Sequence, residues 1–291
     1  MTENLIKRLK ELEERHRAPN GQEYRGLSLK SVETVAKEFN LSKKEVEITA
    51  LEKGIIPLRY QRNIGTIGTK GQIKLLKSTV AVIGAGGLGG GIIELLARQG
   101  MGHIIIADND RFTESTLNRQ LMSTEGDIGK YKAQIAADRV RAINSSLIVT
   151  SYIDTITEGN VKEVLKGADV VVDGLDLLPP RFMVERAARE LGIPFIYGAI
   201  AGFVGQVMTI FPEDEGLSLI YGKKKDYPQR GDEVIAGNPS ATPTMITSWQ
   251  VQEVVKILTG IGKPLRNRLL YLDAKEGVAE VIELKSAGKN G

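Results

Sequence analysis

The sequence contains no cysteine and only two histidines, His16 and His103. The absence of cysteine excludes disulfide bonds, zinc sites built from CxxC pairs, thiol nucleophiles and thioester intermediates. Two histidines provide too little material for a histidine-rich metal site or a Ser-His-Asp triad. No apolar run approaches the ~18 residues of a membrane-spanning helix, and the charged N-terminus is unlike a secretory signal. We therefore expect a soluble, cytoplasmic protein with no membrane partner.

A strong excess of one charge is also lacking. The 291 residues include 39 Lys and Arg and 36 Asp and Glu, so the formal net charge is +3. This small excess does not by itself indicate a polyanionic partner. Hydrophobic residues make up 42% of the chain, which is enough for a sizeable core. At ~150 residues per domain, the length fits one large domain, or a large one with a small companion.

A change of composition predicts two domains, a helical N-terminal module over 1–58 and a larger domain over 59–291. The module is almost free of glycine and rich in Lys and Glu at helical spacing. Its first helix has a narrow apolar stripe formed by Leu5, Leu9 and Leu12. We expect this helix to end at the Pro19–Gly21 turn.

Two shorter helices are predicted over 31–39 and 43–52, the second with a capping box formed by Ser42 and Glu45. The pair resembles a helix-turn-helix, which suggests DNA binding. However, residues 1–58 carry 11 Lys and Arg against 10 Glu, and DNA affinity depends on cations that contact phosphates. We therefore expect a packing or partner-docking module, and nucleic-acid binding is the less favoured alternative.

From residue 79 onward, apolar β-branched runs alternate with amphipathic segments. Strands are expected at 79–83, 103–107, 147–153, 169–173 and 194–199. Helices are expected between them at 87–99, 130–143, 159–166 and 180–191. This alternation predicts an α/β fold with a Rossmann-like, mainly parallel sheet that is covered on both faces.

This alternation of strands and helices ends after residue 200. A strand is expected at 203–211, and a polar, Gly- and Lys-rich stretch follows within 212–242. Loops of that length are usually functional or mobile. A helix is expected to begin near Pro243 with Thr242 as its cap, and two antiparallel C-terminal strands are expected on either side of Lys275–Gly277.

A glycine-rich motif directly follows the strand at 79–83, with the sequence Gly84-Ala85-Gly86-Gly87-Leu88-Gly89. In such a G-x-G-x-x-G motif the first glycine makes a tight turn, the second lets a phosphate approach, and the third lets the helix pack on the strand. The next helix presents free N–H groups to an anion. Asp108 lies 19 residues beyond Gly89, where a carboxylate can accept hydrogen bonds from ribose hydroxyls. The motif predicts nucleotide binding and leaves NAD, ATP and a glycine turn without ligand open.

Charged residues beyond Asp108 favour ATP over NAD. Arg119 and Lys132 can reach the phosphate end of a nucleotide held by the glycine loop. Asp176 follows the fourth strand, at the sheet edge where open α/β sheets bind ligands. A carboxylate that faces a triphosphate is a natural Mg²⁺ ligand. Each residue alone also fits a surface or capping role, but together they predict ATP and Mg²⁺.

With these motifs the chain resembles the ThiF/MoeB/HesA family, the bacterial relatives of ubiquitin-activating enzymes. The resemblance spans about 59–285 and begins with Arg59-Tyr60-Gln61-Arg62. It continues through the glycine loop and then through Asp108 and Asp110, Leu117–Gln120, Lys132 and the D-x-x-D at Asp173–Asp176.

The resemblance implies a homodimer that uses ATP to adenylate the C-terminal glycine carboxylate of a small ubiquitin-like sulfur carrier protein, as in molybdopterin or thiamine sulfur transfer. It implies that Arg119 and Lys132 hold the phosphates, that Asp176 binds Mg²⁺, and that Arg62 acts from the other subunit. The nucleotide-binding residues that it implies are Gly84, Gly86, Gly87, Gly89, Asp108, Asp110, Ser115, Thr116, Asn118, Arg119, Gln120, Lys132, Asp176 and Leu177.

The chain departs from the family pattern in three ways. Thr116 and Leu177 stand where the family usually has Asn, so two amide contacts are lost. The position of the first CxxC pair of many members, Leu217–Gly222, contains no zinc ligand, and the crossover-loop cysteine is missing from 212–242. We therefore expect no zinc and no thioester. Adenylation itself needs no thiol, because the carboxylate attacks the α-phosphate.

Three alternative functions fit parts of the sequence. An enzyme similar to the tRNA threonylcarbamoyladenosine dehydratase would adenylate a carboxylate on tRNA and would be favoured by a basic surface. An NAD-dependent oxidoreductase would not need the cations and carboxylate beyond Asp108. A non-catalytic nucleotide-sensing regulator would bind duplex DNA through the N-terminal module and show no ATP–pyrophosphate exchange.

Overall fold

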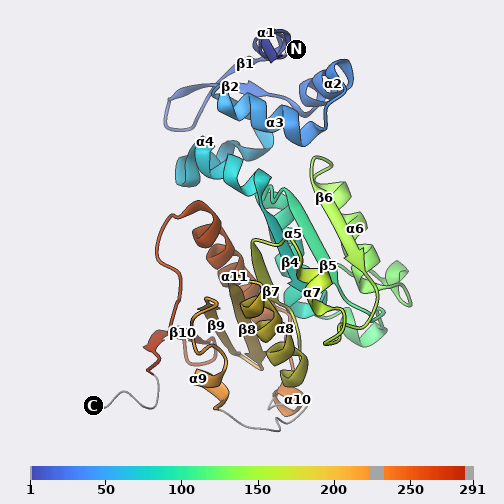
Figure 1. Ribbon diagram of the computed structural model, residues 1–291, viewed down its shortest axis with the longest axis vertical. Helices are drawn as coiled ribbons and strands as arrows, with labels where there is room; N and C mark the ends of the chain where they lie inside the picture. Colours follow the sequence, from blue (N-terminus) through green and yellow to red (C-terminus); the bar gives the residue numbers. More distant parts are fainter. Residues whose placement is uncertain (1, 223–232, 286–291) are drawn as a thin grey trace.

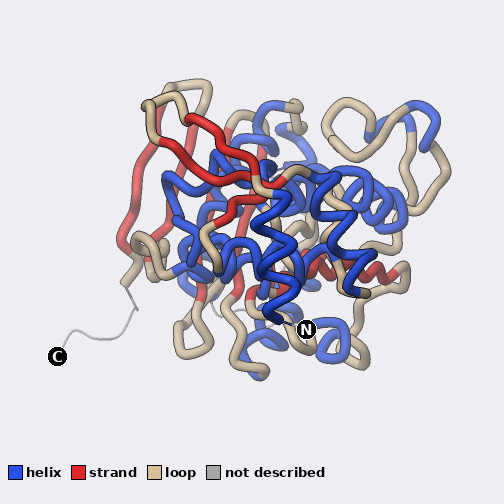
Figure 2. Tube along the Cα trace, turned by 90° about the horizontal axis from the view of Figure 1, so that it is seen from above, coloured by secondary structure: helices blue, strands red, loops and turns tan. Residues whose placement is uncertain are grey.

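A computed structural model of the chain describes residues 2–222 and 233–285. The N-terminal module packs helices against a small sheet and lies at one end of the larger domain (Figure 1). Figure 2, seen from that end, shows the N-terminal helices in front of the larger domain. Its elements are α1 (Thr2–Leu12), β1 (Glu14–Arg17), β2 (Glu23–Leu27), α2 (Leu29–Phe39), α3 (Lys43–Glu52) and β3 (Ile55–Pro57). Leu5 and Leu9 are buried in the module's own core, as their spacing predicts.

The predicted first helix is wrong beyond Leu12. Residues 14–17 form β1, which pairs antiparallel with β2, and the Pro19–Gly21 turn lies in this hairpin instead of ending a helix. The His16 ring stacks on Tyr24, and a Cβ at Gly26 would lie 2.5 Å from the His16 ring. Pairing with a strand further along the chain thus overrides the local helical pattern.

The helix that resembles a DNA-recognition helix, α3, is packed against the larger domain. Lys43 Nζ donates a hydrogen bond to Ser145 Oγ at 2.9 Å, and Ser146 Oγ donates one to the buried Glu47 carboxylate at 2.9 Å. The face of α3 that carries Lys43 and Glu47 is therefore occupied by the larger domain. The predicted capping box of Ser42 and Glu45 is present, and the packing supports a structural role for the module.

The larger domain is an α/β layer structure. Its first elements are η1 (Leu58–Tyr60), α4 (Gln61–Lys77), β4 (Thr79–Ile83), α5 (Gly87–Gln99), β5 (His103–Ala107), η2 (Glu114–Thr116), η3 (Glu125–Asp127), α6 (Lys132–Ile143) and β6 (Ile148–Tyr152). The later ones are α7 (Val161–Leu165), β7 (Val170–Asp173), α8 (Leu178–Glu190), β8 (Phe195–Ala201), β9 (Val204–Ile210), α9 (Ser218–Tyr221), α10 (Glu233–Ala236), α11 (Ala241–Thr259), β10 (Arg268–Asp273) and β11 (Val278–Glu283).

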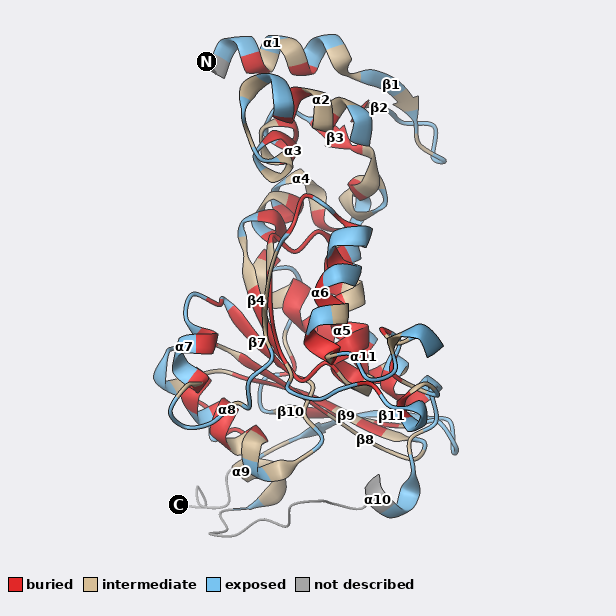
Figure 3. Ribbon diagram, turned by 90° about the vertical axis from the view of Figure 1, so that its right-hand side faces the viewer, coloured by how far each residue is buried: buried red, intermediate tan, exposed pale blue. Residues whose placement is uncertain are grey.

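The strands of this domain form one sheet in the order β11-β10-β9-β8-β7-β4-β5-β6. The neighbouring strands β6, β5, β4, β7 and β8 are parallel to one another. Strands β9, β10 and β11 extend the sheet by antiparallel pairing. Helices α5, α6 and α11 contribute to one core and α7 and α8 to the other, and the buried residues gather along the sheet and these helices (Figure 3). The predicted fold class is confirmed. After β4 the chain adds β5 and β6 on one side of β4 and then crosses to β7 on its other side. The switch point of the sheet therefore lies between β4 and β7.

Two features of this domain differ from the predictions. Helix α11 begins at Ala241, and Thr242 does not cap it, because its hydroxyl donates a hydrogen bond to the Gly202 carbonyl at 2.7 Å. The kinked helix α4 was not predicted, since its three glycines weaken the helical signal. The predicted polar stretch at 212–242 lies partly outside the described residues. Over the ranges 2–222 and 233–285, no helix has the length and apolar character to cross a bilayer.

A buried polar cluster joins the two parts of the chain. The Glu47 carboxylate on α3 accepts hydrogen bonds from Tyr60 Oη at 3.1 Å and from Ser146 Oγ, and the Arg59 guanidinium lies 3.8 Å away. Asn144 Nδ2 donates to Tyr60 Oη at 3.0 Å. Burial raises the pKa of Glu47. The cluster anchors the module at the start of α4.

We expect Glu47→Ala to lower the free energy of unfolding by about 2–4 kcal/mol, because it leaves the buried hydroxyls of Tyr60 and Ser146 without their acceptor and removes the ion pair with Arg59. Glu52→Ala on the same helix removes only an exposed ion pair with Lys77 and should change it by less than about 1 kcal/mol. Urea denaturation of the three proteins measures the difference. Equal midpoints for the two variants would show that the cluster does not stabilise the junction.

Candidate nucleotide-binding site

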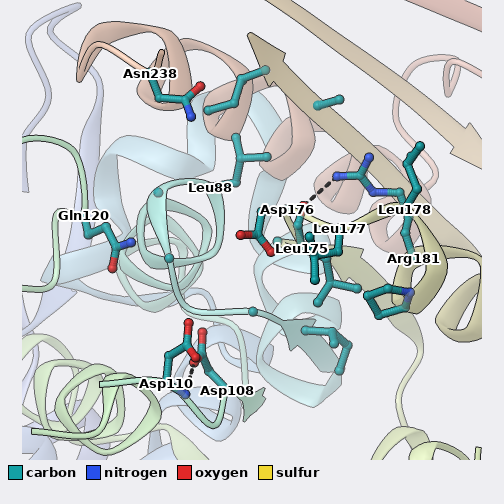
Figure 4. Close-up of a pocket in the computed structure, with 18 of the residues that line it drawn as sticks. Leu88, Asp108, Asp110, Gln120, Leu175, Asp176, Leu177, Leu178, Arg181 and Asn238 are labelled. Carbon is teal, nitrogen blue, oxygen red and sulfur yellow. Dashed lines mark hydrogen bonds between the residues drawn. The ribbon is translucent and has the colours of Figure 1, made fainter. Parts of the chain in front are cut away.

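A cavity of about 1470 Å³ lies at the carboxyl edge of the parallel strands, above the switch point (Figure 4). The loops after β4, β5 and β7 form its floor, and residues 115–120 and Gly237–Asn238 line its rim. Open α/β sheets bind ligands at this place because the loops that follow the strands diverge there.

The glycine loop is shaped by close backbone contacts. Gly84 has φ +94°, and a Cβ there would lie 2.5 Å from the carbonyl oxygen of Gly174. A Cβ at Gly89 would lie 1.8 Å from the carbonyl oxygen of Gly84, so helix α5 packs directly on β4. Gly86 and Gly87 line the cavity at the start of α5, where free N–H groups and the helix dipole favour an anion.

The Asp108 carboxylate is held at the end of β5. It accepts hydrogen bonds from the backbone N–H of Ala85 at 2.6 Å and of Asp110 at 2.8 Å. Its burial raises the pKa of this carboxyl, which these hydrogen bonds and the Lys132 charge oppose. Asp108 thus ties the glycine loop to β5 and still presents lone pairs to the cavity.

Two cationic side chains, Lys132 and Arg119, also line the cavity. The Lys132 side chain is only 8% exposed, and its ammonium lies 2.9 Å from the Asp110 carboxylate. Arg119 Nη1 donates to the Ser115 carbonyl at 3.0 Å and to Asn118 Oδ1 at 2.9 Å. The stem of Arg119 passes within 3.8 Å of a Cβ built on Gly87, so this side chain packs beside the start of α5.

The two carboxylates of the D-x-x-D motif have different environments. Asp173 is fully buried, and its carboxylate lies 2.6 Å from the Arg181 guanidinium. Arg181 also donates to the carbonyl of Leu175 at 2.5 Å, which fixes the loop that carries Asp176. Asp176 is exposed to the cavity, and its carboxylate has no hydrogen bond or ion pair with the rest of the described chain.

The structure brings most of the predicted site residues into one cavity. Those that line it are Gly84, Gly86, Gly87, Asp108, Asp110, Ser115, Asn118, Arg119, Gln120, Lys132, Asp176 and Leu177. Gly89 lies below the loop, and the Thr116 hydroxyl is turned away into a hydrogen bond with Thr113. Arg62 is exposed in the first turn of α4 and does not line the cavity.

Sequence reasoning missed several lining residues, including Arg181, Gln206, Tyr221 and Asn238. Arg181 follows Asp176 by five positions, and this spacing at the start of a helix was an available signal. Asn238 and Gln206 come from distant segments that only the folded sheet brings to the site.

The sequence pattern of the ThiF family matches residues 60–290. This chain belongs to the ThiF family. The predicted family is therefore confirmed, with the fold and the cavity expected for it.

Two proteins resemble this ThiF-family chain over most of its length. The SAMP-activating enzyme E1 of Haloferax volcanii is 34% identical over 230 residues, which cover 78% of this chain and 85% of that protein. The sulfur carrier protein adenylyltransferase of Thermus thermophilus is 35% identical over 226 residues, with 75% and 83% covered. The crystal structure of E. coli MccB with ATP has the same fold, with a TM-score of 0.65 at 20% identity over 89% of this chain and 83% of that one.

The Arg181–Asp173 ion pair gives a prediction for this ThiF-family protein. Arg181→Met leaves a buried carboxylate unpaired and should lower the free energy of unfolding by about 3–5 kcal/mol. The double variant Arg181→Met/Asp173→Asn removes both charges and should recover part of this loss.

Arg186→Met is the matched control on the same helix, because Arg186 is exposed and pairs with Glu158 at the surface. Its cost should stay below about 1 kcal/mol. Urea denaturation provides the comparison, and the absence of any recovery in the double variant would contradict a direct charge pairing.

Proposed function

We propose that this chain is an adenylyltransferase that transfers AMP from ATP to the C-terminal glycine carboxylate of a small sulfur carrier protein. The observation that carries the proposal is the arrangement of three groups in one cavity: Asp108, the start of α5 with its cations, and the unpaired Asp176. The sulfur carrier protein adenylyltransferase of Thermus thermophilus and the SAMP-activating enzyme support the choice of substrate.

The cavity provides separate places for the parts of ATP. The Asp108 carboxylate accepts hydrogen bonds from the ribose hydroxyls. The N–H groups at the start of α5 face the phosphates, and Arg119 and Lys132 add positive charge beside them. Since Lys132 is held by Asp110 before ATP arrives, its charge is already positioned for the reaction.

The residues present also fit a Mg²⁺ ion. Asp176 offers a carboxylate with no partner among the described residues, beside the path of the phosphates, and oxygen ligands are those that Mg²⁺ prefers. A bound Mg²⁺ would neutralise charge on the phosphate oxygens. The turn held by Arg181 keeps the Asp176 carboxylate at this position.

The reaction needs no nucleophile from the protein. A carboxylate oxygen of the carrier attacks the α-phosphorus, the bond to the bridging oxygen of the β-phosphate breaks, and pyrophosphate leaves. The protein has to align the two substrates and stabilise the charge that develops on the phosphates. The inventory of cations, amides and one free carboxylate suffices for this task.

We expect ATP–pyrophosphate exchange that depends on Mg²⁺ and on a sulfur carrier protein ending in Gly-Gly. Lys132→Ala and Asp176→Asn should each lower the rate by about 100-fold or more, because each removes charge stabilisation at the phosphates. Lys130→Ala is the control, since Lys130 is exposed and pairs with Asp127. Titration calorimetry should show binding of ATP with Mg²⁺ and no binding of NAD. Exchange with a carrier that lacks its terminal glycine, or NAD binding without ATP binding, would refute the proposal.

We further propose that the enzyme is a homodimer in which Arg62 contacts the phosphates bound by the other subunit. Arg62 lies outside its own cavity, and a planar guanidinium suits bidentate contact with a phosphate. Arg62→Ala and Asp176→Ala should each be inactive alone. After subunit exchange between them, a mixed dimer has one site with both defects and one intact site, so exchange activity should partly return. No recovery in proven heterodimers would mean that Arg62 does not act across the interface.

A further inference from the structure

A short segment between α10 and α11, residues 237–240, crosses the rim of the cavity; we call it the bridging segment. The Gly237 carbonyl accepts a hydrogen bond from Gly202 N–H at 2.8 Å, at the turn between β8 and β9. The Asn238 carbonyl accepts one from Asn118 Nδ2 at 3.3 Å. The bridging segment is therefore tied through its main chain to both sides of the cavity.

The Asn238 side chain lines the cavity with one end of its amide buried. Its Oδ1 atom is buried and has no hydrogen bond among the described residues, and no bond is formed by its Nδ2 atom there either. Figure 4 shows this amide above Leu88, with its nitrogen on the side of the cavity. The Nδ2 N–H groups, and not the buried Oδ1 acceptor, are therefore the part of this side chain that can meet a ligand in the cavity.

The position of Asn238 indicates which part of a ligand it meets. Asn238 and Asp108 lie at opposite ends of the site in Figure 4, with Leu88 and Asp176 between them. If the ribose lies at Asp108, the phosphates and the acyl carboxylate lie toward Asn238. Both present anionic oxygens, which accept hydrogen bonds from an amide N–H.

Two neighbouring positions of the site, Thr116 and Leu177, present no side-chain amide. The Thr116 hydroxyl is bonded to the Thr113 carbonyl, and Leu177 is apolar, so neither provides a donor to the cavity. Asn238 supplies an amide to this cavity from a different segment.

We propose that Asn238 is a substrate-contacting residue that donates a hydrogen bond from Nδ2 to an anionic oxygen, on a phosphate of ATP or on the carboxylate of the carrier. This inference rests on the proposed function for the nature of the two substrates. The bridging segment positions the amide, and the amide selects for an oxygen that carries negative charge.

The test uses Asn238→Asp and Asn238→Ala in the full chain. Asn238→Asp keeps the size of the side chain but replaces the donor with a carboxylate, which repels an anion, whereas Asn238→Ala removes the whole amide without adding a charge. Neither variant removes the main-chain hydrogen bonds of the bridging segment. Thr244→Ala is the matched control, because Thr244 is exposed in the first turns of α11 and donates only to the Ser240 carbonyl.

Two measurements distinguish the two oxygens. Calorimetry with Mg²⁺ and an ATP analogue that has a methylene between the α- and β-phosphates reports the phosphate contact. The KM for a Gly-Gly-terminated sulfur carrier in pyrophosphate exchange reports the carboxylate contact. We expect about a tenfold or larger loss in one of them for Asn238→Asp, a smaller loss for Asn238→Ala, and no change for Thr244→Ala.

The outcomes separate this inference from the proposed function. If the variants match Thr244→Ala in both measurements, Asn238 does not contact substrate. If the wild type binds the analogue but shows no exchange, the proposed function fails and Asn238 is judged by binding alone. If the wild type does neither, both proposals are wrong. If misfolding causes the loss of binding or activity in Asn238→Asp, its melting temperature will lie below that of Thr244→Ala. The measurements on Asn238→Ala then decide whether Asn238 contacts substrate.

Discussion

The site depends on a close approach of three backbone segments at the switch point of the sheet. Gly84 after β4, Gly89 in α5 and Gly174 after β7 lie so near one another that none has room for a Cβ. The contact places the start of α5 directly beside the end of β7. An anion held by the helix N-terminus is therefore within reach of the loop that carries Asp176, and a larger residue at any of the three positions would separate them.

Buried polar groups hold the loops around this glycine contact in place. The Asp173–Arg181 ion pair holds the turn before α8, and Asp108 ties the glycine loop to β5. At the other end of the domain, Glu47 and Tyr60 lock the N-terminal module to the start of α4. Buried charges are costly unless they are paired, so each of these clusters has a single satisfactory arrangement. The flexible parts of the site are thereby reduced to the exposed side chains that face the ligands.

The sequence alone predicted those helices and strands whose structure depends mainly on residues near in the chain. Strands 79–83 and 103–107 and helix 87–99 were predicted to the residue, because β-branched runs and a glycine motif have few alternative structures. The helix predicted up to the Pro19–Gly21 turn failed because a hairpin partner outweighs helical propensity, and the Thr242 cap failed because the Gly202 carbonyl competes for its hydroxyl. The glycine loop and the charged residues that follow it were found from motifs, whereas Asn238 was not, since its place depends on three distant segments.

The chemical inventory of the cavity limits the reactions that it can support. Its lining residues among those described include no histidine, and the whole chain has no cysteine. His103 is hydrogen-bonded to Thr150 between β5 and β6, and His16 lies in the N-terminal hairpin. No group that commonly exchanges protons near neutral pH or forms acyl intermediates by a thiol therefore faces the ligands. A terminal carboxylate suits such a cavity, because it is ionised at neutral pH and is a nucleophile without the help of a base.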